Sequence, residues 1–102
     1  MRWVALFEDK TDGADIRARF TDAHQAFLRA NKGKIVLAGA MRPAPDGKPV
    51  GGLWVFEADT REEVEAIIRE DPFHREGLRA LVRVYAWGTA PGFEDVAIAP
   101  TA

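Results

Sequence analysis

The order in which strand-like and helix-like segments alternate constrains the fold of this chain more than any other feature. Strand-forming residues are concentrated in residues 2–8, 34–42, 50–58 and 78–87. Apolar residues recur at intervals of three and four in residues 14–31 and 60–70, which predicts two helices. Because 102 residues suffice for one hydrophobic core but not for two, a single folded domain is expected.

The element order is β-α-β-β-α-β, which is the split βαβ or ferredoxin-like arrangement of the α+β class. It predicts a four-stranded antiparallel sheet with both helices on one face. The domain is expected to span residues 1–88, followed by a tail, residues 89–102, that is rich in Pro, Gly and Ala. We expect this tail either to contribute a short edge strand at Val96–Ile98 or to be partly disordered.

Both faces of the predicted sheet are apolar. One alternating set of strand positions is aliphatic: Val4, Leu6, Leu53, Val55, Val82 and Val84. The opposite set contains Arg83 and six aromatic residues: Trp3, Phe7, Trp54, Phe56, Tyr85 and Trp87. We expect the aromatic set on the face without helices, where it would exceed the apolar patch that a soluble monomer exposes. A second copy packed sheet against sheet, as a two-fold homodimer, is the most economical cover, and a folded-back tail is the alternative.

Three local patterns refine the boundaries of the helices and strands. Thr60 and Glu63 fit a capping box at the start of the second helix. Thr21 and Asp22 favour caps over helix interiors, so the first helix is either continuous or broken near residue 21, with Thr21 as a second N-cap. The pair Gly51–Gly52 in the third strand marks a bulge or the close approach of another group.

Composition and charge exclude several classes of function. A net charge of −2 and a pI near 5.6 argue against nucleic-acid binding, which usually needs a basic face. The chain has neither cysteine nor serine, so thiolate and serine nucleophiles and zinc–thiolate sites are excluded. Two histidines form no recognisable metal motif, although a mixed site of histidine and carboxylate stays open. We expect no metal and no cofactor.

Hydrophobic segments that would direct the chain to a membrane are lacking. No run approaches the ~20 apolar residues of a transmembrane helix. The apolar stretch after Arg2 is too short for a signal peptide. We therefore expect a cytoplasmic protein without membrane association.

His24 and Asp71 are the residues best suited to chemistry. On a helical wheel His24 falls ~80° from Ile16, at the edge of the buried stripe, which is a position suited to a cleft. Asp71 continues the apolar stripe of the second helix, so its carboxylate points toward the core. If the first helix is continuous, the rise from Ala14 to His24 (~15 Å) matches that from Thr60 to Asp71 (~16 Å). The two side chains are then expected side by side on parallel helices.

An imidazole and a carboxylate suffice for general acid–base catalysis, but both residues also have structural interpretations. Asp71 followed by Pro72 is typical of the N-cap of a one-turn helix that ends at Gly77, and Asp71 could fill both roles. A histidine beside an apolar stripe is more often structural than reactive. Arg17 and Arg83 would contact an anionic or aromatic ligand, or form ordinary ion pairs.

These residues, in their order along the chain, resemble the YciI-like (YCII-related) family. The matching features are His24 on the first helix, residues 33–41 (GKIVLAGAM), a glycine that opens the third strand near residues 51–58 (GGLWVFEA), residues 71–73 (DPF) with Gly77–Leu78, and Trp87 at the end of the last strand. The resemblance covers residues 1–88. Ala40, Thr21 and Ala86 depart from the family pattern, because they stand where proline, arginine and proline are usual. The missing arginine weakens the case for a shared anion-binding role.

The resemblance implies a ferredoxin-like dimer of the α+β barrel type, with an active site built on His24 and Asp71. It implies acid–base chemistry on a small aromatic or anionic molecule by a lyase, isomerase or hydrolase that needs no cofactor. Arg17, Arg83 and Trp87 are the candidate substrate-binding residues. The alternative is a non-catalytic dimeric module that binds a metabolite or assists a partner protein. A cavity that contains both His24 and Asp71 favours the enzyme, whereas a filled core favours the module.

Overall fold

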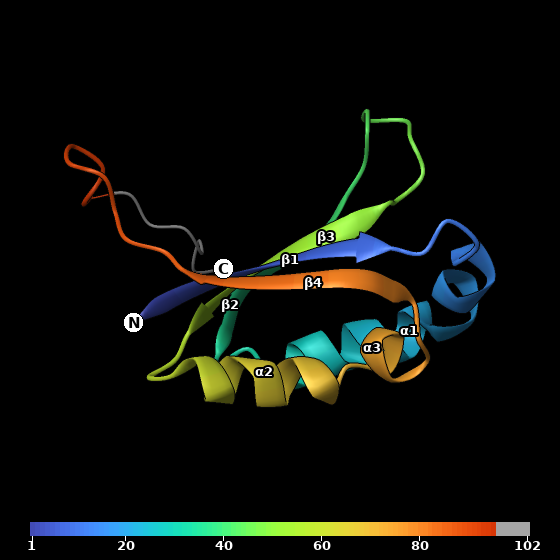
Figure 1. The fold of residues 1–102 in the computed structure, drawn as a ribbon, viewed down its shortest axis with the longest axis horizontal. Coiled ribbons are helices and arrows are strands. Elements are labelled where there is room, and N and C mark those ends of the chain that lie inside the picture. The colour runs from blue at the N-terminus through green and yellow to red at the C-terminus, as the bar shows by residue number, and fades with distance from the viewer. Residues whose placement is uncertain (96–102) are drawn as a thin grey trace.

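The computed structural model describes residues 1–95 (Figure 1). In chain order the elements are β1 (Arg2–Asp9), α1 (Ala14–Ala30), β2 (Ile35–Met41), β3 (Gly51–Glu57), α2 (Arg61–Arg69), α3 (Pro72–Arg75) and β4 (Arg79–Ala86). This confirms the predicted β-α-β-β-α-β order, with α3 as the expected one-turn helix before the last strand. The edge strand considered at Val96–Ile98 lies outside the described residues.

The four strands form one antiparallel sheet in the order β2-β3-β1-β4, which confirms the predicted α+β fold class. Figure 1 shows the helices together on one face of this sheet, while the other face carries none. Helix α1 packs against α3, and this contact brings the middle of α1 to the end of α2. None of the described helices is long and apolar enough to cross a membrane.

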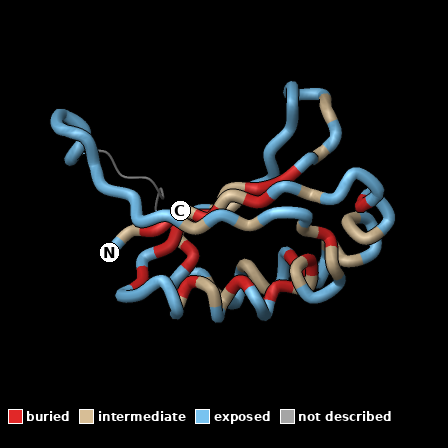
Figure 2. Tube along the Cα trace, in the orientation of Figure 1, coloured by how far each residue is buried: buried red, intermediate tan, exposed pale blue. Residues whose placement is uncertain are grey.

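The hydrophobic core lies between the sheet and the helices, and it contains four of the six aromatic residues that were expected on the opposite face. Trp3, Phe7, Trp54 and Phe56 are all buried there. Figure 2 shows buried segments in both the strands and the helices. The prediction of an aromatic face without helices is therefore wrong for these four. Their large rings fill the space between the sheet and the helix layer, which must be packed to the density of a protein interior.

The predicted alternation is also offset by one residue on β4. Val82 pairs with Phe7 of β1, so it faces the helices together with the aromatic rings instead of lying opposite them. Tyr85 pairs with Val4, and it lies on the face without helices as expected. A shift of one residue moves every side chain of a strand to the other face, and nothing local in the sequence of β4 specifies it.

The sheet surface without helices, called the open face below, is largely apolar, although Arg83 also lies on it. Five of its large side chains are between 37% and 49% exposed: Leu37, Met41, Leu81, Tyr85 and Trp87. Residues 89–95 of the tail are themselves exposed and leave these side chains accessible. An apolar surface of this kind usually marks an interaction site in a soluble protein.

The helix boundaries follow from local signals in the sequence. Thr60 caps α2 by accepting a hydrogen bond from the Glu63 backbone N–H (3.2 Å), as the capping box predicts. The Glu63 carboxylate accepts one from the Asp59 N–H (3.2 Å), one residue earlier than the motif specifies. Helix α1 is continuous: the Thr21 hydroxyl donates to the Arg17 carbonyl in the preceding turn and starts no new helix.

The backbone of β1 lies very close to Gly51 of β3. A Cβ atom at this position would overlap the carbonyl oxygen of Phe7, so only glycine fits there. The close approach expected for Gly51–Gly52 is thereby confirmed. The start of β3 therefore lies against the end of β1, and Arg17 of α1 donates a hydrogen bond to the Gly51 carbonyl there (3.3 Å).

Candidate active site

His24 and Asp71 meet where the middle of α1 passes the junction between α2 and α3. Nδ1 of His24 lies 2.6 Å from Oδ1 of Asp71. The Asp71 side chain is fully buried, and that of His24 is 11% exposed. The structure thus brings together the two residues that were expected to pair, although they are 47 positions apart in the chain.

Asp71 is a helix cap at the same time. Its backbone is extended at the end of α2, and its Oδ1 accepts a hydrogen bond from the Phe73 N–H (3.3 Å) at the start of α3. Pro72 is the first residue of α3, as the sequence predicts. The cap interpretation of Asp71 is therefore confirmed, and the same carboxylate oxygen contacts His24. A catalytic role for Asp71 stays a prediction.

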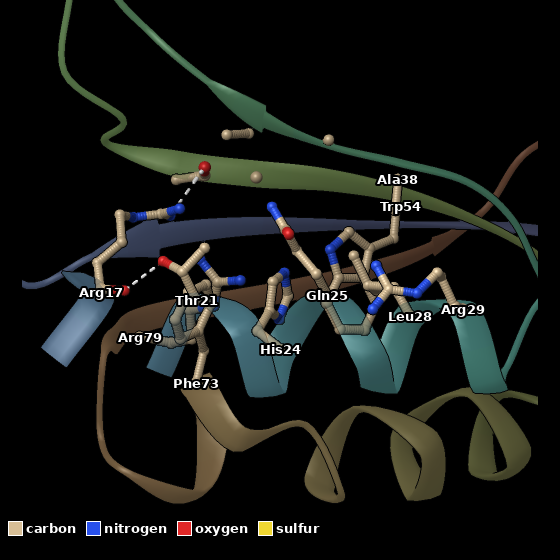
Figure 3. A pocket seen from close by; sticks show the side chains of 14 residues that line it. Arg17, Thr21, His24, Gln25, Leu28, Arg29, Ala38, Trp54, Phe73 and Arg79 are labelled. Carbon is tan, nitrogen blue, oxygen red and sulfur yellow. Dashed lines mark hydrogen bonds between the residues drawn. The ribbon is translucent and has the colours of Figure 1, made fainter. Parts of the chain in front are cut away.

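The His24 ring is held by aromatic neighbours. It stacks on Phe73, with ring centroids 4.0 Å apart and planes inclined by 17°, and Trp54 lies 5.8 Å away. Its second nitrogen, Nε2, takes part in none of the side-chain hydrogen bonds within residues 1–95. Figure 3 shows the ring between α1 and the sheet, beside the cavity. The site therefore presents an imidazole of fixed orientation with one nitrogen available to a ligand.

Behind Asp71 lies a cluster of buried charges. Arg79 Nη1 donates to Asp9 Oδ1 (2.7 Å), and Arg17 Nη2 donates to the other oxygen of the same carboxylate (2.7 Å). Arg79 Nη2 is 3.9 Å from Asp71 Oδ2, which is close enough for a charge interaction but too far for a hydrogen bond. Acidic and basic side chains thus alternate from Asp71 to Arg17.

Asp9 and Arg79 are site residues that the sequence analysis missed. Burial lowers the pKa of Arg79, because the charged guanidinium loses water, while the hydrogen bond and charge of Asp9 and the charge of Asp71 oppose this shift. The two residues pair across β1 and β4, so their contact depends on the strand register. The only local signal is an arginine at the start of a mainly apolar strand, and the same strand also contains Arg83.

A cavity of about 340 Å³ opens beside His24, between α1 and the strands β2 and β3 (Figure 3). Trp54, Phe73 and Leu28 give it aromatic and aliphatic walls, and Gln25 and His24 contribute polar atoms. This volume falls in the range of small-molecule sites. Within residues 1–95, no group of three or more histidine and carboxylate side chains gathers where it could hold a metal ion.

The three predicted substrate-binding residues lie in different places. Arg17 lines the cavity, but its guanidinium is engaged by Asp9 and by the Gly51 carbonyl (3.3 Å). Arg83 lines a separate cavity beside the loop that follows β1. Trp87 lies on the open face. Neither Arg83 nor Trp87 is brought to His24 within this chain, and their role in substrate binding stays a prediction.

A comparison with known protein families shows which family the chain belongs to. The model of the YCII-related domain matches residues 1–88. The chain belongs to the YCII-related family. This confirms the family predicted from His24, the DPF segment and their neighbours. No curated protein matches this YCII-related chain significantly.

Two solved structures resemble this YCII-related protein over most of both chains. The 5-chloro-2-hydroxyhydroquinone dehydrochlorinase of Burkholderia phenoliruptrix AC1100, in complex with 2,5-dihydroxybenzoquinone, is 28% identical, with a TM-score of 0.80 over 88% of this chain and 96% of that one. Protein Atu4242 of Agrobacterium tumefaciens is 12% identical, with a TM-score of 0.55 over 90% and 96%. The second likeness shows the fold alone.

Proposed function

We propose that this YCII-related protein is a lyase that eliminates a small anion from a hydroxylated ring. His24 transfers the proton, and Asp71 is the positioning residue that orients it. The observation that carries the proposal is the 2.6 Å contact between His24 Nδ1 and the buried Asp71 beside a cavity. A base that is oriented by a carboxylate and faces a ligand site is the arrangement that general acid–base catalysis needs.

Asp71 determines which nitrogen of the His24 ring carries the lone pair that faces the ligand. Because the carboxylate accepts the hydrogen on Nδ1, the lone pair of the neutral imidazole is on Nε2. Nε2 then accepts a proton from a ligand hydroxyl, and the negative charge of Asp71 stabilises the resulting imidazolium. The imidazolium can return this proton to a carbon of the ring. A single residue therefore serves as both base and acid.

For a chlorinated hydroquinone these steps balance without an oxidant or a reductant. Loss of one hydroxyl proton forms a carbonyl, and the carbon that bears chlorine gains a proton. Loss of a second hydroxyl proton forms a second carbonyl, and chloride leaves with the electron pair of the C–Cl bond. The net change is the loss of HCl and the formation of a quinone. The 28% identical dehydrochlorinase, with dihydroxybenzoquinone bound, supports this substrate class.

Chloride release under anaerobic conditions tests the proposed function. With 5-chloro-2-hydroxyhydroquinone and related chlorinated hydroquinones, we expect one chloride per molecule consumed, at a rate proportional to the protein concentration. We also expect 2,5-dihydroxybenzoquinone to inhibit competitively. Binding of this quinone without chloride release from any of these compounds would contradict the lyase and favour the non-catalytic metabolite-binding module.

We further propose that a second copy of the chain covers the open face. The exposed apolar side chains of the open face support this, because a two-fold pairing of sheets would bury Tyr85 and its neighbours in both copies at once. Residues 89–95, the described part of the tail, are exposed and do not cover these side chains.

Tyr85→Glu is expected to convert this dimer to a monomer, because it places a charge in the centre of an apolar interface. Light scattering after size exclusion should give about twice the chain mass of 11.3 kDa for the wild type. The variant should give the mass of one chain. Phe93→Glu is the matched control, since Phe93 is a 61% exposed aromatic residue in the tail. A monomeric wild type would contradict the proposed dimer.

A further inference from the structure

Arg29 and Gln25 line the cavity beside His24, but the proposed proton transfer does not use them. They are four residues apart, so they lie one turn from each other on the same flank of α1. Figure 3 shows both side chains at the cavity, near Trp54. Among residues 1–95, neither side chain appears in a hydrogen bond or an ion pair with another side chain.

The charges around this cavity leave Arg29 without a partner within the described residues. Asp9 is already shared by Arg17 and Arg79, with N–O distances of 2.7 Å to each. Asp71 is held by His24 at 2.6 Å. The two buried carboxylates are therefore engaged, and the positive charge of Arg29 is free to meet a negative charge that comes from outside the chain.

The spacing along α1 fits a single substituted ring. His24 and Arg29 are five residues apart, which corresponds to about 7.5 Å of helical rise and about 140° of rotation. Both residues nevertheless line the same cavity. The apolar side chains of Leu28 and Trp54 line the cavity beside this stretch of the helix. A ring that lies against these two side chains with a hydroxyl group at His24 would present its opposite substituent to Arg29 and Gln25.

We propose that Arg29 and Gln25 form a specificity subsite for a carboxylate carried by the ring, on the side opposite the hydroxyl group that meets His24. The guanidinium supplies a charge-assisted hydrogen bond, and the Gln25 amide donates a second one. The preferred ligand class is therefore a hydroxylated aromatic carboxylate. This inference deepens the proposed function, on which it depends for the chemistry at His24 but not for binding.

Isothermal titration with a matched pair of ligands tests the subsite. The probes are 4-hydroxybenzoate and 4-hydroxybenzamide, in which the hydroxyl group lies opposite the carboxylate or the amide. The two molecules differ in charge but little in shape. We expect the wild type to bind the carboxylate at least tenfold more tightly than the amide. Arg29→Met should weaken carboxylate binding at least fivefold and change amide binding less than twofold. Added salt should weaken carboxylate binding to the wild type more than to this variant.

Arg19→Met is the matched control, because it removes the same charge from the same helix outside the cavity. Arg19 is an exposed residue that pairs with Asp15 at 3.6 Å, and this variant should bind both probes as the wild type does. Three results would each overturn the subsite. They are an equal loss of carboxylate affinity in Arg19→Met and Arg29→Met, an equal loss of affinity for both probes in Arg29→Met, and a wild type that does not prefer the carboxylate. A retained preference without chloride release would contradict the lyase and leave the subsite supported.

Discussion

His24→Gln is expected to lower kcat for chloride release by about 10²–10⁴-fold, the usual contribution of a general acid–base residue. Glutamine is similar in length and can still donate a hydrogen bond to Asp71, but it cannot accept and return a proton. The cavity walls formed by Trp54 and Leu28 are unchanged, so the dissociation constant for 2,5-dihydroxybenzoquinone should change less than tenfold. Single-turnover chloride release and quinone titration measure the two effects separately.

His74→Gln is the matched control for this prediction. His74 is the only other histidine, and it lies in α3 beside a different cavity, near Arg69 and Val82. Its variant should release chloride at the rate of the wild type. Comparable rates for His24→Gln and the wild type would exclude His24 as the proton-transferring residue. Equal losses in the two variants would point to a loss of folded protein instead.

Arg79→Met is expected to lower the free energy of unfolding by about 3 kcal/mol, the lower end of the cost of breaking a buried ion pair. The Arg79 side chain is 3% exposed and holds Asp9 at 2.7 Å. Its guanidinium also lies over the rings of Phe7 (4.5 Å) and Phe73 (5.2 Å). Methionine replaces the volume but not the charge. Asp9 keeps Arg17, which is why the expected cost is not larger.

Urea denaturation at a fixed protein concentration measures this difference, since an oligomer would make stability depend on concentration. Arg75→Met is the matched control, because the Arg75 side chain is 64% exposed and its ion pair with Glu70 is long, at 4.0 Å. Exposed pairs of this kind contribute ~0–1 kcal/mol. The double variant Asp9→Asn with Arg79→Met should cost less than the sum of its parts. A loss below about 1 kcal/mol for Arg79→Met would show that the buried cluster is not stabilising.

The fold and the central pair of the site could be predicted because their signals are local. The periodicities of α1 and α2, the Thr60 cap and the Asp71–Pro72 step are all read within a few residues. Together with the topology, they place His24 and Asp71 at equal heights on neighbouring helices. The contact at 2.6 Å agrees with this estimate from helical rise, once α1 packs against the junction of α2 and α3.

The features that were predicted wrongly or missed depend on strand register and on packing between the sheet and the helices, which no short segment encodes. Alternation within β1 and β3 separates their two faces correctly, but it does not say which face the helices cover. The offset of β4 and the pairing of Asp9 with Arg79 have the same origin. The continuity of α1 was undecided because Thr21 favours caps in general, whereas here its hydroxyl bonds to the preceding turn.

The most direct test of the central claim is a crystal structure of the protein with 2,5-dihydroxybenzoquinone. The account predicts the quinone in the cavity lined by His24, Trp54 and Phe73, with one of its oxygens about 2.6–3.2 Å from His24 Nε2 and with Nδ1 still on Asp71. A quinone bound elsewhere, such as on the open face, with no ligand atom within reach of Nε2, would contradict it.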